Sequence, residues 1–223
     1  MTHLYLIRHA QSDGRKPGSV GSAIPYDAGL SPLGIIQAER LRDRFAETSE
    51  IRADVLISSP LLRAKETAEI IAPALGLPVI VDDEVQELNL GDGEGLIFED
   101  LWEKYGDFGL DQEPFRRVAT NGESWAEFTL RACGALDRLI RAYDGKKIVI
   151  VCHGRVIDAS FIYFLGLSTI KQLPIVLDPY YTSITHWYRG YFDGYGWQES
   201  HWCLKRYNDY GHLPDSRLEG TRG

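Results

Sequence analysis

The chain has 223 residues, of which 44% are hydrophobic and 25% are charged, so it can bury the core of one domain and is too apolar for a disordered protein. Its formal net charge of −8 gives no general attraction for nucleic acids or anionic membranes. No apolar run approaches the roughly 20 residues of a membrane-spanning helix, and the N-terminal run is too short for a signal peptide. Together with three cysteines too widely spaced for a disulfide framework, these features predict a cytoplasmic protein that binds neither nucleic acid nor membrane.

The first third of the chain alternates short apolar runs with segments of helical periodicity. Ser31 followed by Pro32 is typical of a helix start, because serine caps free N–H groups and proline fits the first helical position. Gly76 followed by Pro78 is typical of a helix end. The expected elements are a strand at 3–8, a loop at 11–30, a helix from Ser31 to about Thr48, a strand at 54–59, a helix from Pro60 to Gly76 and a strand at 79–85.

The rest of the chain continues this alternation and ends in two more polar strands. The run KKIVIVC at 146–152 is the strongest strand signal. The other expected elements are a short helix at 97–105, an irregular segment at 106–122, a helix from about Glu123 to Tyr143, a helix at 155–166, and strands at 183–189 and 197–208 joined by a turn. This order predicts a single domain over residues 1–223, an α/β fold built as a three-layer α/β/α sandwich. Its sheet should be mostly parallel with an antiparallel edge near the C-terminus, and a lid-like insertion is expected around 89–122.

Histidines directly follow two of the predicted core strands. His9 ends the first strand, His153 ends the strand at 146–152, and each is followed by a small residue. Because ligands of open α/β sheets bind beyond the carboxyl ends of the strands, we expect both histidines at one site. A helix begins after Gly154, so its free N–H groups should point to the same place.

Arg8, Arg63 and Glu87 also lie at or just after strand ends, and their types suit phosphoryl chemistry. The neutral imidazole of His9 has a lone pair that can attack phosphorus, and arginine charge nearby keeps it unprotonated. Both arginines can bind phosphate oxygens in fork geometry. His153 can donate a hydrogen bond to the phosphoryl group as charge spreads. Glu87 can protonate the leaving oxygen and then activate water.

Five motifs in this order resemble the histidine phosphatase superfamily, the phosphoglycerate-mutase-like proteins. They are LIRHAQS, SSPLLRAKETA, ELNLGDGEG, GES at 122–124 and IVIVCHG. The resemblance implies a phosphatase of that fold, with His9 as the phospho-accepting nucleophile and Glu87 as the candidate acid. It also implies that Arg8, Arg63 and His153 complete the phosphate pocket.

Four of the residues that follow His9 bear on this resemblance. Ser12 matches the Thr or Ser of the first motif and is a candidate phosphate ligand, whereas Ala10 and Gln11 replace its usual Gly and Glu. We expect the methyl group of Ala10 to narrow the pocket slightly. Arg15 stands where the family often has Asn, so it should take over a phosphate contact or bind a second anionic group. Three further arginines could face either the pocket or solvent: Arg116, Arg117 and Arg155.

The predicted reaction is metal-independent hydrolysis of a small phosphomonoester through a phosphohistidine, with phosphoproteins left open as substrates. No metal or organic cofactor is expected, because the chain has no HExxH, no GxxxxGK[ST] and no dinucleotide fingerprint. One alternative is a phosphoglycerate mutase, which would return the phosphoryl group to substrate; the missing Asn and the short lid segment argue against it. The other is a non-catalytic phosphate-binding module, which would usually have lost the nucleophile or the acid. The C-terminal edge hairpin could also form a homodimer contact.

Overall fold

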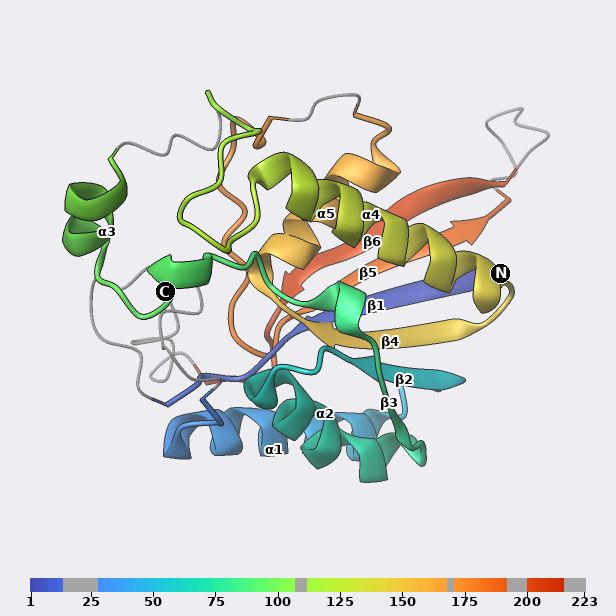
Figure 1. Cartoon of the computed structure of the whole chain (residues 1–223). Helices are drawn as coiled ribbons and strands as arrows, with labels where there is room; N and C mark the ends of the chain where they lie inside the picture. Colours follow the sequence, from blue (N-terminus) through green and yellow to red (C-terminus); the bar gives the residue numbers. More distant parts are fainter. Residues whose placement is uncertain (14–27, 107–111, 168–170, 192–199, 215–223) are drawn as a thin grey trace.

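The fold was analysed in a computed structural model that describes residues 1–13, 28–106, 112–167, 171–191 and 200–214. These residues form one six-stranded sheet with helices on both faces (Figure 1). The elements are β1 (Thr2–Arg8), α1 (Pro32–Thr48), β2 (Val55–Ser58), α2 (Leu62–Leu75), β3 (Val79–Val81), the 3₁₀ turns η1 (Asp83–Val85) and η2 (Gly91–Gly93), α3 (Phe98–Tyr105), α4 (Trp125–Ala142), β4 (Lys147–Cys152), α5 (Gly154–Phe164), β5 (Ile184–Gly190) and β6 (His201–Asp209).

The strand order is β3-β2-β4-β1-β5-β6. The first four strands of this order are parallel, whereas β5 pairs antiparallel with both β1 and β6. The carboxyl ends of β1 and β4 therefore lie side by side, with Arg8 opposite Cys152. This arrangement confirms the predicted α/β class, the mostly parallel sheet and the antiparallel edge.

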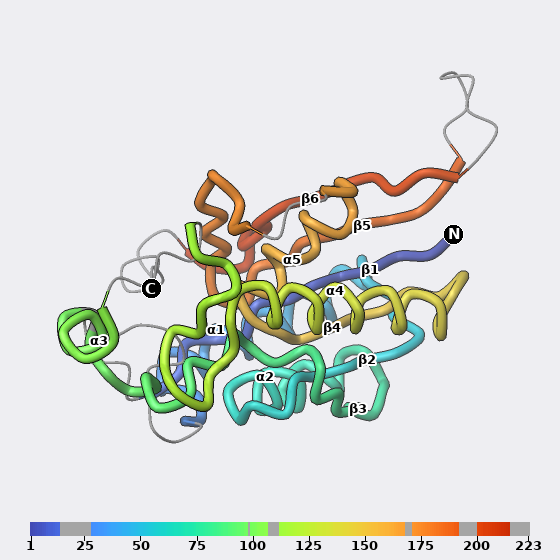
Figure 2. Tube along the Cα trace, turned by 45° about the horizontal axis from the view of Figure 1, so that its top comes forward, coloured from blue at the N-terminus to red at the C-terminus, as the bar shows by residue number. Residues whose placement is uncertain are grey.

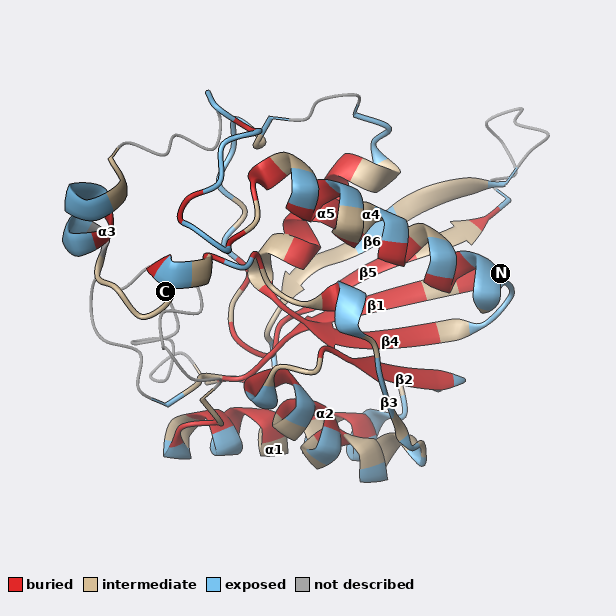
Figure 3. Cartoon of the chain, in the orientation of Figure 1, coloured by how far each residue is buried: buried red, intermediate tan, exposed pale blue. Residues whose placement is uncertain are grey.

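The helices form two layers because side chains alternate between the faces of the central strands. Leu4 and Leu6 of β1 belong to the apolar cluster that includes α4 and α5. Tyr5 and Ile7 belong to the cluster that includes α1 and α2. Figure 3 shows the resulting buried band through β1, β4 and β2. Cys133, Cys152 and Cys203 are not joined to one another by a disulfide.

Among the element boundaries that differ from those expected, two have a clear local cause. The second helix begins at Leu62 rather than at Pro60, because Leu61 is still extended and acts as the N-cap. The third strand ends at Val81 rather than at 85, because the side chain of Asp82 accepts a hydrogen bond from the Glu84 N–H and starts a 3₁₀ turn.

The segment that follows β3 extends past the carboxyl ends of β1 and β4. Both views place α3 there, away from the sheet (Figure 1, Figure 2). Gly91 (φ 58°) packs against the backbone at Gly122, and a Cβ on Gly91 would lie 2.2 Å from the Gly122 nitrogen. This contact closes the segment at its base, and the lid role expected for 89–122 stays a prediction. None of the helices that the structure describes is long and apolar enough to cross a membrane.

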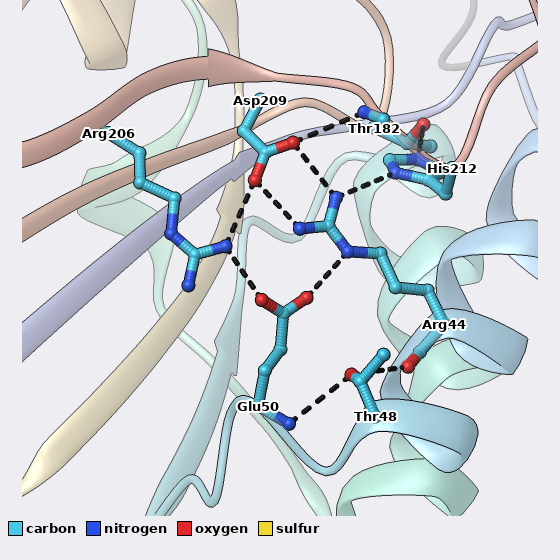
Figure 4. Close-up of polar contacts among 8 residues, drawn as sticks. Arg44, Thr48, Glu50, Thr182, Arg206, Asp209 and His212 are labelled. Carbon is cyan, nitrogen blue, oxygen red and sulfur yellow. Dashed lines mark hydrogen bonds and ion pairs between the residues drawn. The ribbon is translucent and has the colours of Figure 1, made fainter.

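A cluster of ion pairs fixes the end of β6 to α1 (Figure 4). Arg44 of α1 donates to Asp209 through two nitrogens, at 3.0 and 2.7 Å, and to Glu50. Arg206 donates to both of these carboxylates, at 3.0 Å from Asp209 and 2.7 Å from Glu50. The four side chains are only 17% to 29% exposed, so these charges depend on one another more than surface pairs do.

The same cluster supports the chain just before β5. The Nε2 of His212 lies 2.8 Å from the hydroxyl of Thr182, and its Nδ1 lies 3.5 Å from Arg44. Asn208 accepts a hydrogen bond from the Tyr180 N–H at 2.7 Å. The residues at the end of β6 and just after it therefore hold the segment 178–183, which lies beside Arg8.

We expect this cluster to make stability fall in two steps as pH decreases. Burial, followed by the charge of Arg44, lowers the pKa of His212 to about 4, whereas an unfolded chain titrates near 6.5. The unfolded chain binds this proton first, so stability that is complete above about pH 6.5 is lost toward pH 4, by up to about 3 kcal/mol. Hydrogen bonds from Arg44 hold the pKa of Asp209 below its usual range, so the contribution of Asp209 is lost only below about pH 4.

Urea unfolding at about pH 7, 5.5 and 4.5 measures the first step. His212→Asn keeps a donor and an acceptor, and it should reduce the fall in the free energy of unfolding over this range by about 1–2 kcal/mol. His201→Asn, at the other end of β6, is the matched control and should leave the fall unchanged. A His212→Asn protein with the pH dependence of the wild type would contradict the assignment.

Candidate active site

His9 follows the end of β1, and the backbone defines its tautomer. Its Nδ1 lies 2.7 Å from the carbonyl oxygen of Ala10. A carbonyl oxygen only accepts, so Nδ1 carries the proton and Nε2 carries the lone pair. The Nε of Arg63, in the first turn of α2, donates to this Nε2 at 3.2 Å. The lone pair of His9 is therefore on Nε2, and it lies beside a permanent positive charge.

The turn after His9 is fixed by the start of α1. Ser31 caps α1, and its hydroxyl also donates to the side-chain oxygen of Gln11 at 2.7 Å. The backbone of Gly34 lies close to that of Gln11, and a Cβ on Gly34 would lie only 2.0 Å from the Gln11 carbonyl oxygen. Gln11 therefore ties the chain after His9 to the cap of the helix.

Ala10 does not narrow the pocket as the sequence suggested. It is fully buried and packs with Leu30 and Ala38 in a small apolar cluster. Its N–H donates to the hydroxyl of Thr67 in α2 at 3.0 Å. The methyl group therefore lies against protein, and this prediction was wrong because the side chain of residue 10 points toward α1 and α2.

His153 lies at the N-terminus of α5, with its ring centroid 5.0 Å from that of His9. Its Nε2 lies 2.8 Å from the hydroxyl oxygen of Ser59, which also accepts from the Leu61 N–H. In the tautomer in which the Ser59 hydroxyl donates to this Nε2, the proton of the ring lies on Nδ1. This Nδ1 is buried and has no hydrogen-bond partner among the described residues.

His153 is held in its neutral form. It is fully buried, and burial followed by the charge of Arg63 lowers its pKa well below the ordinary value. A neutral ring with a proton on a buried, unsatisfied Nδ1 is suited to donate to a bound anion, because an unpaired buried donor is costly until a ligand arrives.

Ser59 was not singled out in the sequence analysis, and we expect Ser59→Ala to lower kcat about 10-fold. Loss of the hydroxyl leaves the proton of His153 distributed over both nitrogens. Steady-state kinetics with p-nitrophenyl phosphate measure the effect, and Ser200→Ala on the exposed surface is the matched control. An unchanged kcat would remove Ser59 from this role.

Arg8 is held by the segment before β5, which the sequence analysis also missed. Its Nη1 donates to the carbonyl oxygen of Pro179, and its guanidinium carbon lies 4.3 Å from the centroid of the Tyr181 ring. The Thr182 N–H donates to the carbonyl oxygen of Arg8 at 2.9 Å. The Tyr181 ring also faces His9, at a centroid distance of 5.6 Å. The Tyr181 ring thus lies beside both Arg8 and His9.

Glu87 lies half-buried after η1, next to the start of α5. Its Oε1 accepts from the N–H of Leu88 at 2.9 Å, and its Oε2 lies 3.4 Å from the N–H of Arg155. Arg155 is two positions after His153, so the Glu87 carboxylate and the second histidine lie at the same end of the sheet.

Arg131 of α4 holds the backbone around Glu87. Its guanidinium donates to the carbonyl oxygens of Glu84, Gln86 and Glu87, at 2.7, 3.2 and 3.2 Å. It also pairs with Glu123 of the GES motif at 2.7 Å. Arg131 was not predicted, because no local pattern distinguishes it from a solvated helix arginine.

The remaining candidates for phosphate binding differ in their settings. Gly154 begins α5 and faces open space, since a Cβ there would meet no atom within 4 Å. Ser12 is half-buried and forms an isolated bridge with Leu30, and its phosphate contact stays a prediction. Arg15 lies outside the described residues.

Two of the other arginines form surface ion pairs. Arg116 pairs with Glu113 at 3.1 Å, and Arg117 pairs with Glu127 at 2.6 Å. Both arginines are more than 40% exposed, which agrees with the solvent alternative for them. Arg155 instead lines a cavity together with Trp125 and Asp158. In the part of the chain that the structure describes, no three His, Cys, Asp or Glu side chains group as metal ligands.

Two histidines and two arginines at the carboxyl edge of an α/β/α sheet are the arrangement expected of a phosphoryl-transfer protein. The chain belongs to the histidine phosphatase superfamily (branch 1), whose family model matches residues 4–204. It is similar to the uncharacterized phosphatase PhoE of Bacillus subtilis (strain 168), at 30% identity over 213 residues that cover 96% of this chain and 97% of the relative.

Two further proteins extend the comparison. A putative phosphoserine phosphatase 2 of Hydrogenobacter thermophilus is 31% identical over 180 residues, covering 80% of this chain and 86% of the relative. The crystal structure of phosphoserine phosphatase from Entamoeba histolytica, in complex with 3-phosphoglyceric acid, has a TM-score of 0.73 at 27% identity and covers 96% of this chain and 100% of that one. The family and these relatives identify the chain as a hydrolase that acts on phosphate esters.

Proposed function

We propose that this protein hydrolyses a phosphomonoester without a metal, through a phosphohistidine formed at the Nε2 of His9. The observation that carries the proposal is the tautomer of His9. The carbonyl oxygen of Ala10 holds the proton on Nδ1, so the lone pair lies on Nε2, 3.2 Å from the Arg63 guanidinium. A nucleophile beside a phosphate-binding cation is what attack on a phosphate ester requires.

In the first step, the lone pair of Nε2 attacks phosphorus and the bond from phosphorus to the leaving oxygen breaks. The carboxylic acid of Glu87 gives its proton to that oxygen, so the product leaves as a neutral alcohol. Charge on the phosphoryl oxygens is met by the guanidinium groups of Arg8 and Arg63 and by the Nδ1–H of His153. The contact from His9 Nδ1 to the carbonyl oxygen of Ala10 stabilises the positive charge that the ring acquires.

In the second step, the phosphoryl group passes from His9 to water. The carboxylate of Glu87 takes a proton from a water molecule, whose oxygen attacks phosphorus. The bond from phosphorus to Nε2 breaks, inorganic phosphate leaves, and the lone pair returns to His9. Glu87 is again protonated, so the cycle consumes one ester and one water and restores every group.

The test is to trap the intermediate. The protein is mixed with p-nitrophenyl phosphate in excess chelator and quenched in alkali within one turnover, because phosphohistidine survives alkali and not acid. Alkali-stable phosphate on the peptide that contains His9, with continued turnover in chelator, is the expected result. Two relatives are named as phosphoserine phosphatases, so O-phospho-L-serine is a second substrate for this assay.

Two outcomes would reject the proposal. Turnover that stops in chelator and returns with a divalent metal would show that the reaction requires a metal. Turnover that needs a bisphosphorylated primer and yields an isomer of the substrate would indicate a mutase instead.

A further inference from the structure

The GES motif at 122–124 takes no part in the proposed reaction, and it lies against the turn that follows Glu87. A Cβ on Gly122 would lie 2.9 Å from the carbonyl oxygen of Asn89, so only a residue without a side chain allows this approach. The N–H of Glu123 donates to the same oxygen at 2.7 Å. The motif therefore joins the start of α4 to the backbone two positions after Glu87.

A two-point ion pair links this motif to the body of α4. Both carboxylate oxygens of Glu123 accept from Arg131, each at 2.7 Å, one from Nε and one from Nη2. Oε2 of Glu123 also accepts from the N–H of Asn89 at 3.1 Å. The two paired side chains are only 22% and 20% exposed, and a two-point pair of planar groups fixes their orientation as well as their distance.

The guanidinium of Arg131 also holds the chain before Glu87. Its Nη1 donates to the carbonyl oxygens of Glu84 and Gln86, and its Nη2 donates to that of Glu87 itself. Glu87 follows η1 and belongs to no helix or strand, so these bonds take the place of those that a regular element would provide. The ion pair on α4 thus fixes the backbone on both sides of Glu87.

The position of the Glu87 carboxyl group depends on this backbone. Its Oε1 accepts from the N–H of the next residue, Leu88, at 2.9 Å, and this short-range contact moves with the chain. Proton transfer to a leaving oxygen requires a separation of about 2.6–3.2 Å between the two oxygens. A displacement of about 1 Å can cost about 100-fold in rate, so a device that fixes the backbone bears directly on the transfer.

We propose that Arg131 and Glu123 are positioning residues for proton transfer by Glu87, and that this is the role of the GES motif. They act through the backbone of Glu87 rather than on the substrate. The inference rests on the proposed function for the acid, and on the contacts of Arg131 for the positioning. An ester whose leaving group needs no proton should therefore be insensitive to the ion pair.

Arg131→Gln tests this role with two esters. The kcat/KM for glycerol 2-phosphate, an alkyl ester, should fall about 10- to 100-fold, whereas that for p-nitrophenyl phosphate should fall less than about 3-fold. The matched control is Arg138→Gln, two turns further along α4, where the arginine pairs with Asp82 and Glu84 at the surface. It should leave both values unchanged. Equal slowing of the two esters by Arg131→Gln would overturn the proposal, because general damage to the site acts on both.

Two further variants keep the test decisive if Arg131→Gln does not fold. Arg131→Lys keeps the charge beside Glu123 but loses the planar fork, and should show the same selective loss at about 3- to 10-fold. Glu123→Gln should also slow the alkyl ester selectively, with Glu113→Gln in an exposed pair as its control. Thermal unfolding identifies the folded variants. Wild-type rates in both of these variants would overturn the proposal.

The double variant separates this proposal from the acid role itself. With Glu87→Gln no proton is left to position, so adding Arg131→Gln should not change the ratio of the two kcat/KM values any further. A further change would overturn the positioning role. If Glu87→Gln alone leaves the ratio unchanged, the acid role falls and the positioning role falls with it. If Glu87→Gln changes the ratio and Arg131→Gln does not, only the positioning role falls.

Discussion

His9→Ala should lower kcat for p-nitrophenyl phosphate by about four orders of magnitude. The variant has no atom to form the bond to phosphorus, and no other imidazole can take its place, because Nε2 of His153 faces Ser59. The arginines remain, so phosphate binding should persist. Initial rates measure the activity, while phosphate titration and thermal unfolding show that the protein is still folded.

The matched control is His201→Ala, at the end of the sheet opposite to His9. His201 pairs with Gly190, whereas the first strand runs away from that end toward His9. Its kcat should equal that of the wild type. A folded His9→Ala protein with wild-type turnover would end the phosphohistidine mechanism.

Glu87→Gln should separate substrates by their leaving groups. A glutamine cannot give up a proton, so kcat/KM for an alkyl phosphate should fall about 100- to 1000-fold. The fall for p-nitrophenyl phosphate should stay below about 10-fold, because its leaving group is a stabilised anion that needs little protonation. Initial rates with both esters, under the same conditions, measure the two ratios.

Glu84→Gln is the control, since Glu84 lies three positions earlier and pairs with Arg138 at the surface. Both esters should react with it as with wild type. Equal slowing of the two esters by Glu87→Gln would take Glu87 out of the acid role and leave it as a structural contact to the start of α5.

Much of the fold was predictable because its signals are local. Apolar runs, the Ser31-Pro32 start and the Gly76 end each define one element without reference to the rest of the chain. The end of the third strand was wrong because it depends on a single hydrogen bond, that from the Glu84 N–H to Asp82. Such bonds compete with strand pairing, and their outcome is not visible in apolar periodicity.

The site was predictable only where it follows strand ends. Parallel pairing of β1 with β4 brings His9 near His153, and the first turn of α2 brings Arg63 to the same place. Ser59 and Tyr181 were missed because each acts through a contact with a residue distant in sequence. The catalytic roles of the predicted residues stay predictions.

The support of Arg8 by Pro179 also bears on the order in which the protein becomes active during synthesis. This contact joins residues 171 positions apart. The ribosome makes the chain from its N-terminus, so His9 and Arg8 are synthesised well before Pro179, which supports Arg8. Contacts of such long sequence separation form late and slowly, because a long loop must close before they stabilise anything. A growing chain that has not yet reached Pro179 would therefore carry His9 without the support of Arg8, and hydrolytic activity would begin only after Pro179 has been synthesised.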